Sequence, residues 1–206
     1  TTPEVWRIPL RDELLPSLTV EAPRGGYVVP AGHAARVAEH LALHGIGFER
    51  LESAMAGAEV ETFRADDWTL SSTSMEGHQR LELQGEWRPE RRDLAAGSLF
   101  VPVGQPGARL VMSLLEPRAP DSYAAWGRFN NHFERKEYME AYVAEEVARD
   151  MLAADPALEA EFRERLRGDP DFAASPRARL DFFYRRHAAW DEQFGLYPVL
   201  RADWTP

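Results

Sequence analysis

The stretch that most constrains the fold lies in the middle of the chain. It runs from Gly97 to Trp126 and reads GSLFVPVGQPGARLVMSLLEPRAPDSYAAW. Its first apolar run is too short for a helix and ends at Gln105-Pro106-Gly107, after which the apolar residues follow helical spacing. This pattern predicts a buried strand that leads into a helix. Strand-like segments precede the stretch and helical segments follow it, so we expect it to join both halves into one core.

Short segments with strand character dominate the first half of the chain. Val5 to Leu10 alternates apolar and polar residues, as a half-buried strand does. From Ala31 the apolar period changes to three and four, which predicts a helix that ends at His44-Gly45. We expect Asp66 to Gly77, which is polar and without period, to be a loop with at best a short strand at Trp68 to Leu70, and the charged run Arg88 to Asp93 to be a solvated turn. The other strand candidates are 18–20, 27–29, 47–51, 59–64 and 80–88, the last with a bulge at Gly85.

The second half of the chain has helical periodicity. The segment from Lys136 to Leu152 is expected to be a helix, with its apolar face formed by Tyr138, Tyr142, Val143, Val147 and Met151. Asp155-Pro156 and Ser175-Pro176 each combine a capping residue with a proline suited to the first turn, so each predicts a helix start. Leu196 to Arg201 is expected to be a last strand.

These segments together predict an α+β fold. We expect a mixed, mostly antiparallel sheet in the N-terminal half and a helical C-terminal half. We interpret residues 1–206 as a single domain, with 1–104 mainly β with one helix and 105–206 mainly α. A chain of 206 residues buries enough surface to fold without cross-links. The chain starts on Thr1, from which we expect either processing or a longer parent.

Composition excludes several classes of function. The formal net charge is −10, whereas a nucleic-acid-binding surface needs a basic face. No apolar run approaches the length of a membrane span. Cys is absent, which excludes disulfides, thiolate metal sites and a cysteine nucleophile but leaves the compartment unassigned. We therefore expect neither a nucleic-acid nor a membrane partner.

No catalytic, cofactor-binding or metal-binding residue can be assigned from motifs. His40 and His44 are four residues apart on one predicted helix, but the Glu of the His-Glu-x-x-His zinc motif is missing. None of the six His has Glu three residues later, and no Gly-x-Ser-x-Gly occurs.

A few residues remain as candidates for ligand binding or for an interface. Arg185 and Arg186 beside His187 suit an anion, although arginines at helix ends more often pair with carboxylates. Trp6 and Trp204 are aromatic anchors near the two ends of the chain, of the kind enriched at interfaces.

Most of the chain resembles the region that follows the catalytic domain in large bacterial zinc carboxypeptidases related to carboxypeptidase A. The resemblance rests on YVVPAGHAARVAEHLALHGIGFERL from Tyr27, VETFRA from Val60, EGHQR from Glu76 and the central stretch. It continues through FERKEYMEAYVAEEVARDML from Phe133 and LDFFYRRHAAWDEQFGLYPVLR from Leu180. That family holds zinc with a His-x-x-Glu pair and a distant His, none of which occurs here. The resemblance therefore implies a non-catalytic C-terminal accessory domain, with zinc held only by the parent metallopeptidase.

Three hypotheses follow for the function. The first is this accessory domain, which would support or position the catalytic domain or a peptide substrate, with the upstream catalytic domain as its partner. The second is an independent peptide- or anion-binding module. The third is a small hydrolase with an unrecognised site. We also expect the isolated chain to self-associate if its apolar ends are exposed, and we assign no cofactor to it.

Overall fold

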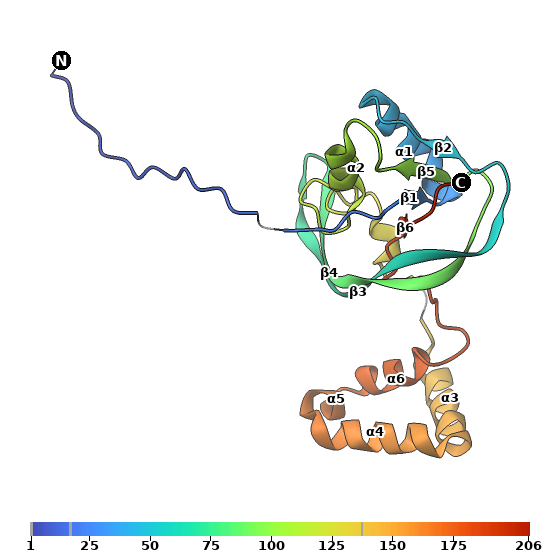
Figure 1. Ribbon diagram of the computed structural model, residues 1–206. Coiled ribbons are helices and arrows are strands. Elements are labelled where there is room, and N and C mark those ends of the chain that lie inside the picture. The colour runs from blue at the N-terminus through green and yellow to red at the C-terminus, as the bar shows by residue number, and fades with distance from the viewer. Residues whose placement is uncertain (1, 17, 137) are drawn as a thin grey trace.

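A six-stranded sheet forms the centre of the computed structural model, which describes residues 2–16, 18–136 and 138–206 (Figure 1). The strand order is β2-β5-β1-β6-β3-β4, and every strand pair is antiparallel. The α+β fold expected from the sequence is confirmed. The strands are β1 (Gly26–Val29), β2 (Glu49–Arg50), β3 (Met55–Met75), β4 (His78–Leu94), β5 (Leu99–Pro102) and β6 (Leu200–Ala202).

The central stretch forms the predicted strand and helix. Strand β5 pairs with β1 on one side and β2 on the other, and Leu99, Phe100 and Val101 are buried. After the Gln105-Pro106-Gly107 corner, helix α2 (Ala108–Leu115) buries Val111 and Leu115 in the main core. Helix α1 (Ala31–Leu43) adds Ala34, Val37, Ala38 and Leu41 to the same cluster, as its period predicted.

Strands β3 and β4 form one long hairpin that curves around the body (Figure 1). The predictions of a loop at Asp66 to Gly77 and of a turn at Arg88 to Asp93 are therefore wrong, because both segments lie largely within these strands. Both segments consist mostly of exposed side chains, so they lack the alternation of a strand with one buried face and the sequence did not indicate them as strands. The predicted irregularity at Gly85 is confirmed by the register shift between Ala65 and Asp67 opposite it.

The C-terminal helices form a unit of their own. They are α3 (Ala141–Ala154), α4 (Pro156–Gly168), α5 (Pro170–Ala174) and α6 (Pro176–Tyr184), and a 3₁₀ turn, η1 (Asn130–His132), precedes them. Figure 1 shows this unit set apart from the sheet and joined to it by two connecting segments. Its apolar cluster contains Phe172, Phe182 and Phe183, with Phe162 packed against them. The sequence predicted that these helices would share one core with the central stretch. In the part of the chain that the structure describes, they instead pack on one another in a separate apolar cluster.

Local capping explains why these helices begin where they do. The Asp155 carboxylate accepts hydrogen bonds from the backbone N–H groups of Ala157 and Leu158, at 2.9 and 3.1 Å, and Pro156 opens α4. Ser175 caps α6 in the same way. Both predicted helix starts are confirmed. None of the helices in the described ranges is long and apolar enough to cross a membrane.

The boundaries of three other elements differ from the predictions. Helix α3 begins at Ala141 and buries Ala144 and Ala148, whereas Tyr142, expected on its apolar face, is 74% exposed. The last strand is short and centres on Arg201. Segments 5–10 and 18–20 are not strands in the part of the chain that the structure describes, because alternation gives a strand only where a neighbouring strand supplies hydrogen bonds.

Candidate interaction site

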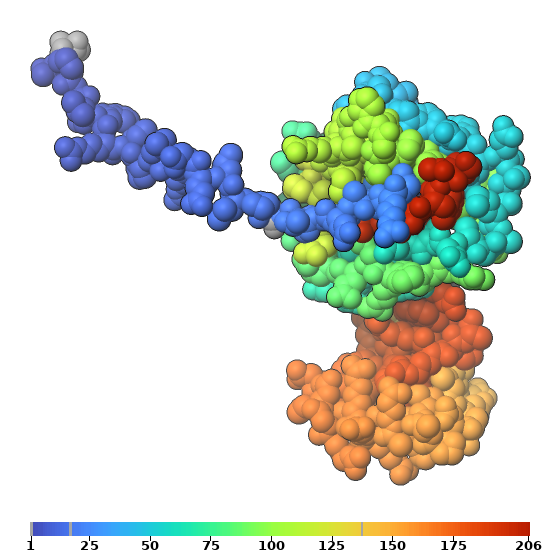
Figure 2. Space-filling model, in the orientation of Figure 1, coloured from blue at the N-terminus to red at the C-terminus, as the bar shows by residue number. Residues whose placement is uncertain are grey.

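The N-terminal segment, residues 2–16, is extended and projects away from the folded body (Figure 2). Its large apolar side chains are almost fully exposed, from 77% for Ile8 to 94% for Leu14. The others are Val5, Trp6, Leu10 and Leu15. Soluble proteins rarely expose a run of large apolar side chains unless something covers it in the working assembly. This segment is therefore the candidate interaction site.

The sequence of the segment suits an extended mode of recognition. In an extended chain alternate side chains point to opposite sides, which places Trp6, Ile8 and Leu10 together. Arg7 and Arg11 lie on the other side and would remain in solvent. Pro9 has no backbone N–H and prevents regular pairing at its position. The segment thus presents a short apolar edge to a partner and a basic edge to water.

The segment joins the sheet beside the last strand of the chain. The backbone N–H of Arg24 donates to the Asp203 carboxylate at 2.9 Å, and that of Gly25 donates to the carbonyl of Ala202 at 3.0 Å. A Cβ added to Gly25 would lie 2.1 Å from the carbonyl oxygen of Trp204, so no larger residue fits this crossing. The exposed segment therefore leaves the body from a fixed point near the C-terminus.

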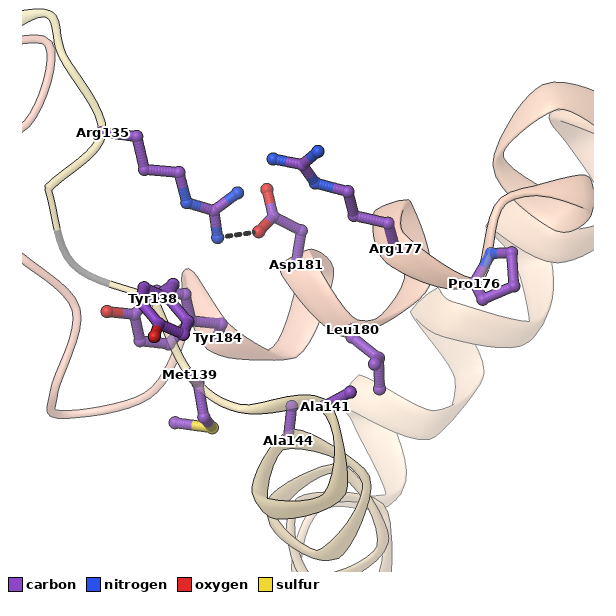
Figure 3. A pocket seen from close by; sticks show the side chains of 10 residues that line it. All are labelled: Arg135, Tyr138, Met139, Ala141, Ala144, Pro176, Arg177, Leu180, Asp181 and Tyr184. Atoms are coloured by element: carbon purple, nitrogen blue, oxygen red, sulfur yellow. Dashed lines mark hydrogen bonds and ion pairs between the residues drawn. The ribbon is translucent and has the colours of Figure 1, made fainter.

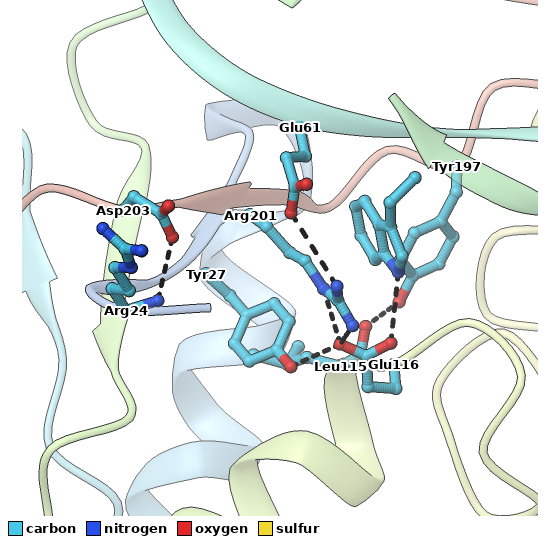
Figure 4. A network of polar contacts seen from close by, with 9 residues as sticks. Arg24, Tyr27, Glu61, Leu115, Glu116, Tyr197, Arg201 and Asp203 are labelled. Carbon is cyan, nitrogen blue, oxygen red and sulfur yellow. Dashed lines mark hydrogen bonds and ion pairs between the residues drawn. The ribbon is translucent and has the colours of Figure 1, made fainter. Parts of the chain in front are cut away.

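A buried ionic network lies in the core near this point (Figure 4). Glu116, at the end of α2, is 3% exposed, and Arg201 of β6 is 8% exposed. One Glu116 oxygen accepts hydrogen bonds from Arg201 Nε at 2.9 Å and Nη2 at 2.6 Å, and from the Tyr27 hydroxyl at 2.5 Å. The other accepts from Trp87 Nε1 at 3.3 Å, and the Arg201 guanidinium lies 4.4 Å from the centre of the Trp87 ring.

The network is structural in character. Burial, and then the negative charge of Glu116, raise the pKa of the Tyr27 hydroxyl well above its usual value, so Tyr27 stays a donor. Burial also raises the pKa of Tyr197, whose hydroxyl donates to the carbonyl of Leu115 at 2.9 Å. Each carboxylate oxygen of Glu116 is engaged by donors within the protein. The network ties α2 to β1, β4 and β6 and offers no free group for chemistry.

The candidate residues from the sequence do not form one site. Trp204 stacks on Phe100 and donates from Nε1 to the carbonyl of Glu59 at 2.6 Å, so it is a fixed part of the sheet rather than a free anchor. Trp6 is 79% exposed, on the projecting segment. The remaining three candidates lie at the end of α6, in the helical unit.

Both arginines at that helix end have carboxylate partners. Arg186 donates to Glu161 at 2.6 Å and to the carbonyl of Phe182 at 2.9 Å. Arg185 lies 3.4 Å from Asp181 and over the Trp190 ring. The Nδ1 of His187 accepts from the N–H of Ala189 at 3.1 Å. This is the pairing usual at helix ends, and it leaves no obvious anion site there.

The helical unit contains a cleft that the sequence did not indicate (Figure 3). It has a volume of about 560 Å³ and lies between α6 and the segment that leads into α3. Arg135 and Asp181 form an ion pair across it, and Tyr138, Met139 and Leu180 supply apolar walls. Arg135 and Asp181 are 46 positions apart in the sequence, and no spacing rule connects the residues of this cleft.

Within the described residues, no three His, Cys, Asp or Glu side chains lie close enough together to hold a metal ion. Comparison with protein-family models, with curated proteins and with solved structures finds no match for this chain.

Proposed function

We propose that this chain is a non-catalytic C-terminal accessory domain of a bacterial zinc carboxypeptidase, which docks on the catalytic domain through residues 2–16. The observation that carries the proposal is the exposed apolar run from Val5 to Leu15. The folded body has a complete core without this run. Its side chains must therefore be covered by something other than their own domain.

Apolar burial is the main favourable term that a partner would gain from this run. Burial of a large apolar side chain contributes about 1.5–3 kcal/mol. Full burial of all six would contribute about 9–18 kcal/mol, which is comparable with the roughly 1–2 kcal/mol per residue that ordering the segment costs. The partner is assigned to the zinc-bearing domain because of the resemblance that covers most of this sequence. In this proposal the catalytic domain holds the zinc. A peptide substrate would contact the accessory domain only while it is bound to the catalytic domain.

The test is a binding titration between this chain and the zinc-bearing domain of the same polypeptide, followed by sedimentation. We expect a stoichiometric complex, and we expect Trp6→Ala to weaken it about tenfold or more, since aromatic anchors dominate such interfaces. The matched control is Tyr142→Ala, which removes an equally exposed aromatic side chain from the helical unit. This variant should bind like the wild type.

Two outcomes would refute the proposal. If the chain is a strict monomer with no affinity for the zinc-bearing domain, the independent binding module becomes the better interpretation. If the isolated chain hydrolyses peptides, the small hydrolase is the better interpretation. A peptidase assay on the isolated chain, with and without added zinc, separates these two cases.

A further inference from the structure

The backbone of the projecting segment is as exposed as its apolar side chains. Residues 2–16 contain neither helix nor strand, and none of their backbone groups hydrogen-bonds to the backbone of another described segment. Figure 2 shows them leaving the body without folding back onto it. A partner that covers the apolar side chains also removes water from these N–H and C=O groups. It therefore has to replace the lost hydrogen bonds.

The prolines of the segment exclude two of the common ways in which a short segment binds a protein. Pro9 lies in the middle of the apolar run and would break a helix there, and the apolar residues from Trp6 to Leu10 repeat every two positions. A polyproline ligand requires the PxxP spacing, whereas Pro3, Pro9 and Pro16 are six and seven positions apart. Addition of the segment to the edge of a sheet, as an extra strand, meets neither obstacle.

Pro9 also determines which side of such a strand can pair. In a strand the N–H and C=O of one residue point to one side, and those of the next residue point to the other side. Pro9 has no N–H, so its side faces away from the neighbouring strand. The N–H groups of Trp6, Ile8 and Leu10 then point toward that strand. The side chains of the same three residues share one face of the enlarged sheet.

The sheet of this domain offers no open edge to the segment in the described part of the chain. Strand β2, at one edge, has only two residues, and β4 forms the other edge. In β4 the N–H of Leu81 donates to the carbonyl of Ala125 at 3.2 Å, and Pro89 interrupts the edge farther along. Between these points β4 lines two surface pockets together with residues 18–21 of the same chain. The acceptor edge therefore belongs to another domain.

We infer that residues 5–10 add as an outer strand to a sheet edge of the zinc-bearing domain, paired through the N–H groups of Trp6, Ile8 and Leu10. The identity of the partner rests on the proposed function. The kind of surface follows from the segment itself: an exposed edge strand whose sheet has an apolar face to receive the three side chains. Pro9 lies on the outer side of the added strand and prevents the addition of a further strand there.

The first test is amide hydrogen exchange, measured by NMR on the isotope-labelled chain in complex with the unlabelled zinc-bearing domain. We expect the N–H groups of Trp6, Ile8 and Leu10 to exchange at least about tenfold more slowly than in the free chain. Those of Arg7 and Arg11 point away from the partner and should keep nearly the exchange rates of the free chain. Alternate protection of this kind is specific to a paired strand.

The second test compares two proline variants in a binding titration. Ile8→Pro removes an N–H that points at the partner, whereas Arg7→Pro removes one that points away. Ile8→Ala and Arg7→Ala are the matched controls, because each removes the same side chain and keeps the N–H. We expect Ile8→Pro to bind about tenfold more weakly than Ile8→Ala, and Arg7→Pro to bind within about threefold of Arg7→Ala. Thermal unfolding should be the same for all four variants, because both positions lie outside the folded body.

The possible results separate this inference from the docking on which it rests. A complex in which the segment shows uniform exchange, or in which both proline variants bind equally well, would overturn strand addition and leave the docking in place. Protection of Arg7 and Arg11 instead of Trp6 and Ile8 would overturn the assigned side. If no complex forms, the docking is refuted and the inference with it. A dimer of the isolated chain with the same alternate protection would assign the acceptor edge to a second copy and overturn its assignment to the zinc-bearing domain.

Discussion

The buried pair of Glu116 and Arg201 allows a sharp prediction about stability. Removing one partner of a buried ion pair leaves the other charge unpaired and typically costs about 3–5 kcal/mol. We expect Glu116→Leu to fall at the upper end, because it also removes the acceptor for Tyr27 and Trp87. Arg201→Met should fall at the lower end, because Glu116 keeps those two donors.

The double variant Glu116→Leu with Arg201→Met should be much less destabilised than the sum of the single variants. An apolar pair carries no uncompensated charge, but Tyr27 and Trp87 still lose their acceptor, so the double variant stays destabilised. With single costs of about 5 and about 3 kcal/mol and a double cost of about 5 kcal/mol, the coupling free energy is about 3 kcal/mol. Urea unfolding at neutral pH, followed by far-UV circular dichroism and by Trp fluorescence, gives the four free energies of unfolding that the cycle requires, for the wild type, the two single variants and the double variant.

The control for this cycle is the ion pair between Arg91 and Glu59, whose atoms approach to 2.7 Å while both side chains are about three-quarters exposed. Its coupling should be below about 1 kcal/mol and should shrink further in salt. The Glu116–Arg201 coupling should depend little on salt, because the pair is buried. Additive effects of the two single substitutions, within about 0.5 kcal/mol, would refute this account of the network.

Further predictions concern the core, a helix cap and pH. Leu115→Ala should cost about 2–5 kcal/mol in urea unfolding, because this side chain is fully buried, and Leu114→Ala, on the half-buried side of α2, should cost less. Asp155→Ala should lower the unfolding free energy by about 1 kcal/mol through loss of the α4 cap, and Asp150→Ala within α3 serves as its control. Burial, and then the neighbouring His33, lower the pKa of His132 from 6.5 to about 4. The unfolded chain therefore takes up a proton that the folded chain does not, so stability should fall as pH drops from about 6.5 to about 4, by at most roughly 3 kcal/mol. His132→Gln should flatten that part of the pH profile, and an unchanged profile would contradict the assignment. Elemental analysis of untagged protein should find no stoichiometric zinc, whereas one tightly held zinc per chain would contradict the absence of zinc motifs.

Local signals in the sequence were sufficient for several elements. The strand and helix of the central stretch, the helix from Ala31 and the starts at Asp155 and Ser175 depend on apolar period and on side chains that cap the helix they begin. Such interactions join residues a few positions apart. They are present in the sequence whatever the rest of the chain does.

The long β3–β4 hairpin and the separate helical unit were not predictable in this way. The hairpin is held by backbone pairing between residues up to 39 positions apart, and its polar stretches at 66–77 and 88–93 lack the apolar alternation that indicated its strands at 59–64 and 80–88. The N-terminal segment shows the opposite error, since Val5 to Leu10 has the alternation of a strand but pairs with no strand among the described residues.

The buried network was decided only by the tertiary structure. Glu116 and Arg201 are 85 positions apart, and each resembles an ordinary surface residue in the sequence. They are brought together because β6, from the end of the chain, inserts between β1 and β3. Sequence determines which segments can be strands or helices, because those preferences are local. Which strands pair and which charges meet is a property of the whole chain. It depends on which distant segments pack together and exclude water from the space between them.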